Sequence, residues 1–528
     1  MTNRVISRSL VALLLVVACL VFVGFGSARD NTLVIARPSD AISLDSNQET
    51  TAPGAWVYSN IIEPLVSLNP DMELEPRLAT SWEFISPTTL RFYLQKGVTF
   101  HDGTPFTAEA VKFTFDRALF GEPRANWATL GADPISEVKV IDDYTVDIIT
   151  KDPYGPILST MAMVYTGIIS PAAVEKYGEE YGRHPVGTGP FKFQEWRTRD
   201  KIVLVANEDY WRGRPALDKV IFRVIPEEGS RMLSLRTGEV DMVLKPSPAE
   251  LPAFKADPSF GTVETAGLRV FYLAFNLEIP PLDDVRVRHA IAHAIDKQSI
   301  LENVLEGAAG PAKSSLLAPG VFGFYGWDID QLYPYDPNKA VELLNDAGWT
   351  DEDGDGILEK GGQDLVLRFM PAKGRYLKDI EIAEVIEAQL REVGVRVELE
   401  VFEWATAFGK ARSADFPYAF HSFGWVTTNA DADYTLHSMF ISELTPPTGW
   451  NAFRYSNSEV DRLVKLGRVT VDQAERKAIY ARAQVLIAAD LPFVPIYTTK
   501  EIAVISAGVK GLRMHPVEYN IDLYPVHY

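Results

Sequence analysis

The segment 90–119 predicts a strand, a tight turn and a capped helix in direct succession. Residues 90–94 alternate apolar and polar side chains, as a half-buried strand does. Asp102-Gly103 is typical of a turn, because glycine adopts positive φ without a Cβ clash. Thr107 then occupies a helix N-cap position, where its hydroxyl can accept an amide hydrogen. Apolar residues follow at helical spacing: Val111, Phe115, Ala118 and Leu119.

Strand and helix signals of this kind alternate to the end of the chain, which favours α/β lobes. The length predicts two to four domains. Asp336-Pro337 predicts the start of a helix that ends at Gly348. Asp472 and Glu475 form the pattern of a capping box ahead of another helix. We expect the apolar faces of these helices to be core.

The N-terminus has the composition of a secretory signal peptide. Arg4 and Arg8 form a positive region, and Leu10 to Phe25 is an apolar run of 16 residues, shorter than the ~20 that span a membrane. Small residues then favour cleavage after Ala28. The alternative is lipoprotein processing at Cys19, which would tether the protein to a membrane. Cleavage after Ala28 and lipoprotein processing both predict export, to the periplasm or to the outer face of the cytoplasmic membrane.

Composition excludes several classes of function. Cys19 is the only cysteine, so a chain cleaved after Ala28 has no disulfide, no thiol catalysis and no cysteine-based metal site. The formal charge is −20, and the loss of Arg4 and Arg8 makes it −22. Such an acidic chain, without a basic patch, is not expected to bind nucleic acid.

Sequence patterns of common enzymes are missing. The chain has no G-x-S-x-G elbow, no P-loop and no H-E-x-x-H motif. His289 and His293 stand at i and i+4 of a predicted helix, a spacing that zinc sites use. No Glu or Cys accompanies them in that helix, so we expect no zinc site and no enzyme activity.

Six motifs occur in order along the chain. One such motif alone would be weak evidence, but six in the right order support a common interpretation. They are Phe100–Val111, Pro185–Phe193, Asn207–Trp211, Asp284–Asp296, Ala347–Gly356 and Tyr455–Asp461. Together they resemble the family 5 solute-binding proteins, the extracytoplasmic receptors of ABC importers for peptides and related solutes.

The resemblance implies an α/β fold with two lobes, of the class II periplasmic-binding-protein type, and an additional domain inserted in lobe I. By analogy, the chain divides into a signal peptide at 1–28, lobe I at 30–69, 187–266 and 490–528, the additional domain at 70–186, and lobe II at 267–489. The chain is expected to cross between the lobes near Gly267 and near Leu491-Pro492.

The resemblance also implies a function. The protein would capture a peptide or peptide-like solute between its lobes, close by a hinge motion and deliver the solute to an ABC permease in the membrane. It would act as a monomer, without a cofactor and without covalent chemistry. Two alternatives stay open. One is a receptor of the same fold for an oligosaccharide or another small solute, and the other is a secreted hydrolase.

A segment of lobe II is the first candidate for the binding site. Gly424-Trp425-Val426 matches a segment whose backbone binds the extended ligand in peptide-binding relatives, as an added strand would. In those relatives an Asp three residues after the Trp holds the ligand's α-ammonium, and here Thr428 stands at that position. A hydroxyl cannot neutralise a buried ammonium. Either Asp431 or Asp433 replaces the carboxylate, or the ligand has no free amino terminus.

Four further residues are implied by the resemblance. Arg375 lies one residue from an Arg that grips a ligand carboxylate in dipeptide-binding relatives, a task that suits its planar guanidinium. Asp45 belongs to a loop of lobe I that faces the cleft in relatives. Tyr272 and Asn276 lie in the first predicted strand after a crossover and are expected to face the ligand.

An acidic turn is the one candidate for a metal site. Asp351, Asp353 and Asp355 resemble the first half of an EF-hand loop, but Gly362 occupies the twelfth position, where a bidentate Glu should close the loop. Glu359 could substitute for it. We favour a solvated turn over a calcium site.

Overall fold

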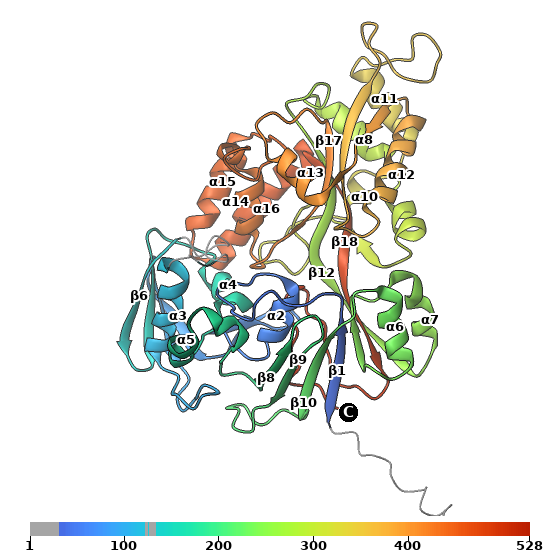
Figure 1. The fold of residues 1–528 in the computed structure, drawn as a ribbon. Helices are drawn as coiled ribbons and strands as arrows, with labels where there is room; N and C mark the ends of the chain where they lie inside the picture. Colours follow the sequence, from blue (N-terminus) through green and yellow to red (C-terminus); the bar gives the residue numbers. More distant parts are fainter. Residues whose placement is uncertain (1–30, 122–124, 126–133) are drawn as a thin grey trace, which may run out of the picture.

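The computed structural model describes residues 31–121, 125 and 134–528. The predicted signal peptide, with Cys19, lies outside these residues. The described chain is a mixed α/β protein with two lobes, which lie one above the other in Figure 1 and are joined by long strands. Among the described residues, no helix combines the length and apolar character of a membrane span.

One large sheet of twelve strands runs through both lobes. Its lobe II part has the order β15 (Arg396–Leu399), β14 (Val366–Lys373), β17 (Phe420–Val426), β12 (Phe260–Phe275) and β18 (Phe493–Ser506). Its lobe I part continues with β11 (Met242–Leu244), β1 (Thr32–Arg37), β10 (Lys219–Val224), β9 (Lys201–Ala206) and β8 (Phe191–Arg197). Two short strands are attached, β13 (Ala309–Pro311) to β18 and β16 (Phe402–Glu403) to β14.

The strands β12 and β18 connect the lobes. The first half of β12 pairs with β18 in lobe I, the register then shifts between Ala266 and Val270, and the second half pairs with both β18 and β17 in lobe II. A Cβ on Gly267 would lie 2.6 Å from the hydroxyl oxygen of Thr499. A larger residue here would therefore force the Thr499 side chain to shift, and the proposed lobe boundary falls in this irregular stretch.

The second crossing lies further along the chain than the sequence suggested. β18 begins at Phe493 in lobe II, pairs there with β12 through Thr498, and reaches the lobe I strand β11 only at Ala503. Leu491-Pro492 precedes the strand and remains in lobe II, because one continuous strand carries the chain from one lobe to the other.

β12 presents its two faces to two hydrophobic cores of lobe II. Phe271 and Leu273 pack in the core formed with α8 (Val285–Ala294), α11 (Pro337–Asp346) and α12 (Asp379–Glu392). Tyr272 and Ala274 belong to the core formed with α14 (Ala432–Phe440), α15 (Ser458–Val469) and α16 (Gln473–Asp490). The period-2 alternation of a strand separates the two sets, and helices cover both faces of this sheet in Figure 1.

The additional domain contains a separate sheet with the order β4 (Ala79–Ser86), β5 (Thr89–Leu94), β7 (Thr145–Thr150) and β6 (Ile135–Asp142). β5 and α3 (Ala108–Phe120) confirm the predicted strand and helix. Thr107 is the N-cap residue, but its side chain makes no capping bond. Instead, the Asp143 carbonyl accepts the Ala108 amide hydrogen at 2.8 Å, so the neighbouring turn takes over part of the capping.

Two other predicted helix starts are confirmed with their caps. The Asp336 carboxylate accepts the Lys339 amide hydrogen at 3.0 Å at the start of α11. Asp472 accepts the Glu475 amide hydrogen at 2.8 Å at the start of α16. The remaining helices named in Figure 1 are α2 (Ala52–Tyr58), α4 (Ile157–Met161), α5 (Pro171–Tyr177), α6 (Glu228–Arg236), α7 (Leu251–Ala256), α10 (Ile329–Leu332) and α13 (Trp404–Ala411).

The additional domain also touches lobe II through the segment around α4. The Gly155 amide donates to the Arg468 carbonyl at 2.9 Å, and the Ser159 hydroxyl donates to Asp431 at 3.2 Å. A Cβ on Gly155 would lie 2.2 Å from the carbonyl oxygen of Thr470. The lobes therefore meet closely here as well as along β12 and β18.

Candidate ligand-binding site

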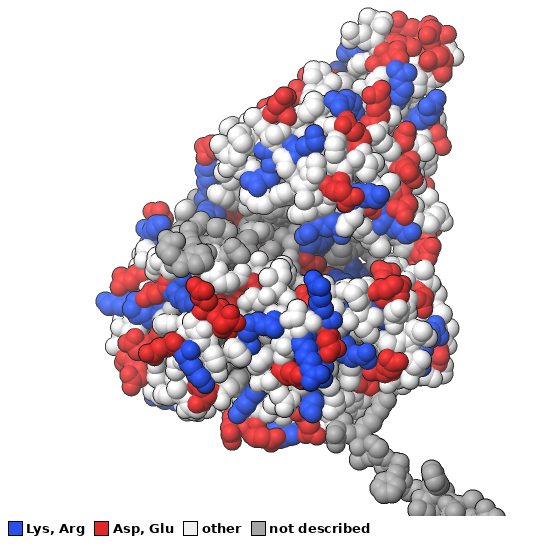
Figure 2. All heavy atoms as spheres, in the orientation of Figure 1, with Lys and Arg blue, Asp and Glu red and all other residues white. Residues whose placement is uncertain are grey.

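A cavity of about 830 Å³ lies between the two lobes. Lobe I contributes Arg231, Lys245 and Glu518 to its wall, and lobe II contributes Arg269, Arg375 and Lys378. Figure 2 shows the molecule hollowed between the lobes, with Lys and Arg side chains at the edges of the hollow. Sites for small ligands typically enclose roughly 300–1,000 Å³, so this interlobe cavity has the size of a ligand site.

A second cavity, of about 220 Å³, lies in lobe II. It shares Arg269, Arg375 and Tyr376 with the interlobe cavity. With Tyr376, aromatic residues make up most of its wall: Tyr272, Trp404, Phe408, Phe423, Trp425, Tyr434 and Trp450 from lobe II, and Tyr519 from the C-terminal segment of lobe I. Aromatic walls with a few polar groups are typical of sites for organic solutes. The two cavities adjoin and together form the candidate site.

The strand β17 reaches the lobe II cavity with one edge unpaired. β14 pairs with β17 only as far as Ser422, whereas β12 pairs with it as far as Val426. In the part of the chain that the structure describes, no strand covers the other edge of Gly424-Trp425-Val426. A Cβ on Gly424 would lie 2.8 Å from the ring of Tyr376. The glycine therefore allows Tyr376 to lie against the strand, where its hydroxyl donates to the Gly424 carbonyl at 3.3 Å.

Trp425 is held by ring contacts and one hydrogen bond. Its indole N–H donates to the Thr435 hydroxyl at 2.9 Å. Its ring stacks on Tyr434 with centroids 5.5 Å apart, and Trp450 meets it edge-on at 5.8 Å. An indole fixed in this way offers a rigid apolar surface to a ligand.

Two ion pairs neutralise charges next to the interlobe cavity. Arg269 pairs with Glu518 at 2.5 Å, and Lys245 pairs with Glu501 at 2.7 Å. Burial alone would raise the pKa of Glu518, but the charges of Arg269 and Lys245 outweigh it and lower this pKa to about 2. At Glu501 burial prevails over Lys245 and the pKa is raised. Arg269 and Lys245 are thus already engaged within the protein.

Of the residues predicted from the sequence, Gly424-Trp425-Val426, Arg375 and Tyr272 line the lobe II cavity. Tyr272 does so with only 2% of its surface exposed, because its ring packs against Phe453 and Phe493. Its contribution to the core is therefore larger than its contribution to the cavity.

The predicted carboxylates Asp431 and Asp433 do not face the cavities. Asp431 is 0% exposed and forms a two-point ion pair with Arg476, with N–O distances of 2.8 and 3.1 Å. Asp433 is 1% exposed and accepts a hydrogen bond from Arg468 at 2.7 Å. Both carboxylates already have an arginine partner, so neither one supplies the missing ligand for an ammonium group.

Three other predicted residues lie outside both cavities. Thr428 lines a separate cavity of about 20 Å³, which is too small for a solute. The Asn276 amide donates to the Phe416 carbonyl at 3.0 Å in the interior. Asp45 pairs with Arg117 of the additional domain at 2.6 Å. We therefore leave all three residues out of the proposed site.

Trp404, Phe408 and Arg412 also line the lobe II cavity and were not predicted from the sequence. Trp404 and Phe408 lie one turn apart on α13 and stack with centroids 5.0 Å apart. Their i, i+4 spacing is visible in the sequence and indicates a shared aromatic face. No pattern in the sequence around Glu518 indicates a role in the site. This residue reaches the interlobe cavity only because the C-terminal segment returns to lobe I.

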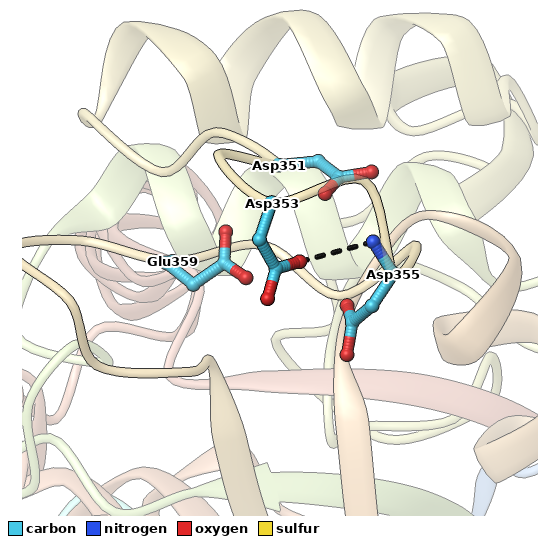
Figure 3. A group of neighbouring side chains, drawn as sticks. All are labelled: Asp351, Asp353, Asp355 and Glu359. Atoms are coloured by element: carbon cyan, nitrogen blue, oxygen red, sulfur yellow. Dashed lines mark hydrogen bonds between the residues drawn. The ribbon is translucent and has the colours of Figure 1, made fainter.

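The acidic turn after α11 is shown in Figure 3. The carboxylates of Asp351, Asp353, Asp355 and Glu359 lie within 4.8 Å of one another. They accept backbone hydrogen bonds within the turn, including one from the Asp355 amide to Asp353 at 3.0 Å, drawn as a dashed line. This is the bonding of a solvated acidic turn, and we propose no metal site there.

A buried histidine lies beneath the aromatic wall of the lobe II cavity. His421 is 0% exposed, and neither ring nitrogen has a hydrogen-bond partner among the described residues. The rings of Phe416, Phe423 and Phe453 surround it at centroid distances of 5.5, 5.0 and 6.4 Å. Burial lowers the pKa of His421 to about 3, and the charge of Arg454 adds to this shift. The imidazole is therefore neutral in the folded protein at neutral pH.

We expect His421→Phe to make the protein less sensitive to acid. Below its ordinary pKa of 6.5 the histidine binds a proton in the unfolded chain but not in the folded one, so the wild type loses stability as pH falls toward 3. One such group changes the free energy of unfolding by at most ~1.4 kcal/mol per pH unit. Urea unfolding should show the variant gaining up to about 2–3 kcal/mol on the wild type between neutral pH and about pH 4.5.

The exposed His527 provides the control for this experiment. His527→Phe makes the same substitution at an exposed position and shows what the exchange of histidine for phenylalanine does outside the core. Parallel pH profiles for His421→Phe and the wild type would show that His421 does not stay neutral in the folded state.

Comparison with known proteins gives a consistent result. The family profile described as "Bacterial extracellular solute-binding proteins, family 5 Middle" matches residues 73–444. Heme-binding protein A of Haemophilus influenzae is 32% identical over 491 residues, which cover 89% of this chain and 86% of the relative. The dipeptide-binding protein of Escherichia coli is 31% identical over 484 residues, which cover 87% of each protein.

Solved structures agree with the sequence relatives. HbpA2 from Haemophilus parasuis superimposes with a TM-score of 0.83 at 26% identity, over 94% of this chain and 99% of that structure. The periplasmic binding protein DppA from Helicobacter pylori, in complex with the peptide STSA, superimposes with a TM-score of 0.73 at 28% identity, over 94% and 98% of the two chains.

Two lobes around a ligand-sized cavity, together with these relatives, place the chain among the substrate-binding proteins, a class that binds small ligands. This chain belongs to the bacterial extracellular solute-binding proteins of family 5, which deliver their ligands to the permeases of ABC importers. The family and the fold class predicted from the sequence are thereby confirmed. Its relatives include periplasmic binding proteins, which implies export.

Proposed function

We propose that this protein captures a peptide or peptide-like solute between its lobes and delivers it to its permease. The observation that carries the proposal is the unpaired edge of β17 at Gly424-Trp425-Val426, beside the lobe II cavity. An extended peptide can add to such an edge as a further strand, with main-chain hydrogen bonds supplying affinity. The dipeptide-binding relative and the peptide complex of the Helicobacter pylori protein support this ligand class.

Binding and closure are coupled because both lobes contribute to the interlobe cavity. A solute that contacts Lys245 of lobe I and Arg375 of lobe II gains both contacts only in the closed arrangement, and this difference shifts the equilibrium toward closure. We place the hinge at the register shift of β12 near Gly267. We further propose a monomer exported by a signal peptide cleaved after Ala28, with a lipid anchor at Cys19 as the alternative.

Thermal unfolding with a panel of solutes tests the ligand class. Peptides of two to four residues are expected to raise the melting temperature, because a ligand that binds only the native state stabilises it by about 2.7 kcal/mol at 100 times its Kd. The same peptides with N-methylated backbone amides keep their side chains but lose donors that strand pairing uses. We expect these analogues to stabilise the protein less. Oligosaccharides and nickel ions complete the panel.

Stabilisation by an oligosaccharide and by no peptide would contradict the peptide proposal and favour the alternative receptor of the same fold. Equal stabilisation by a peptide and its N-methylated analogue would argue against pairing with β17. Mass spectrometry after long incubation addresses the hydrolase alternative. We expect the peptide to be recovered intact, and cleavage products that scale with protein concentration would overturn a purely binding function.

A further inference from the structure

Two arginines line the lobe II cavity without a carboxylate partner. Arg375 and Arg412 belong to its wall, where the described residues include no Asp or Glu, and neither guanidinium forms an ion pair within the described chain. Other arginines of lobe II behave differently. Arg368 on β14 and Arg396 on β15 pair with carboxylates at 2.7 and 2.8 Å. The cavity therefore keeps positive charge that the protein neutralises elsewhere in the same lobe.

Arg412 is stacked on aromatic rings rather than paired. It follows the last residue of α13, and its guanidinium carbon lies 4.2 Å from the ring centroid of Trp450 and 5.7 Å from that of Phe408. Stacking fixes the plane of a guanidinium and leaves its in-plane N–H groups to donate. The Nε of Arg412 is buried and has no acceptor among the described residues. A ligand in the cavity cannot reach this buried Nε, but the terminal N–H groups of Arg412 have no acceptor among the described residues and remain available to an anionic group.

The neighbouring interlobe cavity is also basic, although the whole chain has a formal charge of −20. Six basic residues line it against Glu228 and Glu518. Arg269, Lys245 and Lys378 are paired with carboxylates, whereas Arg231, Arg375 and Lys500 have no carboxylate partner within the described residues. In Figure 2 several blue side chains flank the hollow between the lobes. A cleft that carries one sign of charge between low-dielectric walls focuses the field and attracts ions of the opposite sign.

We infer that the lobe II cavity binds an organic anion that carries an aromatic or other flat apolar group. The anionic group accepts hydrogen bonds from Arg412, and the flat group lies among Trp425, Trp450 and Phe408. No carboxylate of the described chain lines this cavity to receive an ammonium group, so solutes without a free amino group are preferred. Because the cavity is part of the proposed binding site, this inference rests on that function, but it requires no peptide backbone.

Two fluorescent probes isolate the contribution of the charge. Anilinonaphthalene sulfonate and phenylnaphthylamine share the same two aromatic systems, and only the first carries an anionic group. The protein is unfolded and refolded first, to remove any solute that co-purifies. We expect the sulfonate to bind at least about tenfold more tightly, because hydrogen bonds to charged groups are the stronger ones. Its Kd should also rise with added NaCl, which screens the attraction.

Arg412→Gln removes the charge and keeps a planar polar group. This variant is expected to weaken binding of the sulfonate about tenfold while it changes the Kd of phenylnaphthylamine by less than about twofold. Arg368→Gln, outside the cavity, is the matched control and should change neither Kd. Equal affinities for the two probes, no binding of the sulfonate, or an unchanged sulfonate Kd in Arg412→Gln would each overturn the inference.

The result can be separated from that of the peptide panel. Sulfonate binding that depends on Arg412, together with no stabilisation by any peptide, would overturn the peptide proposal and support the anion site. Stabilisation by peptides together with equal binding of the two probes would support the peptide proposal and overturn the anion site.

Discussion

Replacing Arg476 by methionine is expected to lower the free energy of unfolding by about 3–5 kcal/mol. Arg476 is 0% exposed and binds both carboxylate oxygens of Asp431, while its Nε donates to the Gly467 carbonyl at 3.1 Å. Methionine occupies a similar volume but leaves Asp431 buried without its partner. The loss is large because the buried carboxylate has lost its hydration and no longer has an ion pair to compensate for it.

The ionisation of Asp431 gives this loss a characteristic pH dependence. Burial raises the pKa of Asp431, and the charge of Arg476 opposes the shift. Without Arg476 the pKa rises further, so the folded variant retains a proton that the unfolded chain releases above the ordinary pKa of 3.8. The stability deficit of the variant should therefore grow as pH rises and shrink in acid.

Urea unfolding at about pH 5 and about pH 8 measures both effects. Arg462→Met is the matched control, because Arg462 pairs with Glu459 on the exposed surface of α15, where an ion pair contributes less than about 1 kcal/mol. Adding Asp431→Asn to Arg476→Met removes the unpaired charge and should recover part of the loss. A deficit no larger than that of Arg462→Met would mean that Asp431 finds another partner or water.

Local elements of this fold were predictable because their signals lie within a few residues. The alternation at Leu90–Leu94 identifies β5, and the side chains of Asp336 and Asp472 identify the starts of α11 and α16 through bonds to amides three residues away. Thr107 marks the right position, but a turn 36 residues later in the chain, at Asp143, supplies the acceptor for Ala108. Local patterns cannot reveal such a partner.

The binding site was only partly predictable because the topology brings its members together. Asp431 follows Trp425 by six residues and was predicted as one of two possible replacements for the Asp that holds the ligand's α-ammonium in relatives. Its actual partner, Arg476, lies 45 residues further along the chain on α16 and binds the carboxylate in the protein interior. The pair of Arg269 and Glu518 spans 249 residues. Neither partnership leaves a periodicity or a spacing that the sequence alone would show.

We expect Trp425→Ala to weaken binding of the most strongly stabilising peptide of the panel by about 30-fold or more, which corresponds to an aromatic anchor worth about 2 kcal/mol. The substitution removes the surface that Tyr434 and Trp450 hold in place beside the edge of β17. The Thr435 hydroxyl loses its indole donor but keeps its bond to Thr427 at 2.8 Å. The fold should therefore tolerate the change, and isothermal titration calorimetry would measure the loss of affinity.

Trp349→Ala is the matched control, since Trp349 belongs to the same lobe but lines neither cavity. It should leave the Kd unchanged while removing the same side chain. If Trp425→Ala binds the peptide as tightly as Trp349→Ala does, the solute lies elsewhere in the interlobe cavity, and the unpaired edge of β17 is not where it is held. A loss confined to Trp425→Ala, with both variants unfolding near the wild-type temperature, would assign the effect to contact with the solute, because a general loosening of lobe II would lower the melting temperature as well.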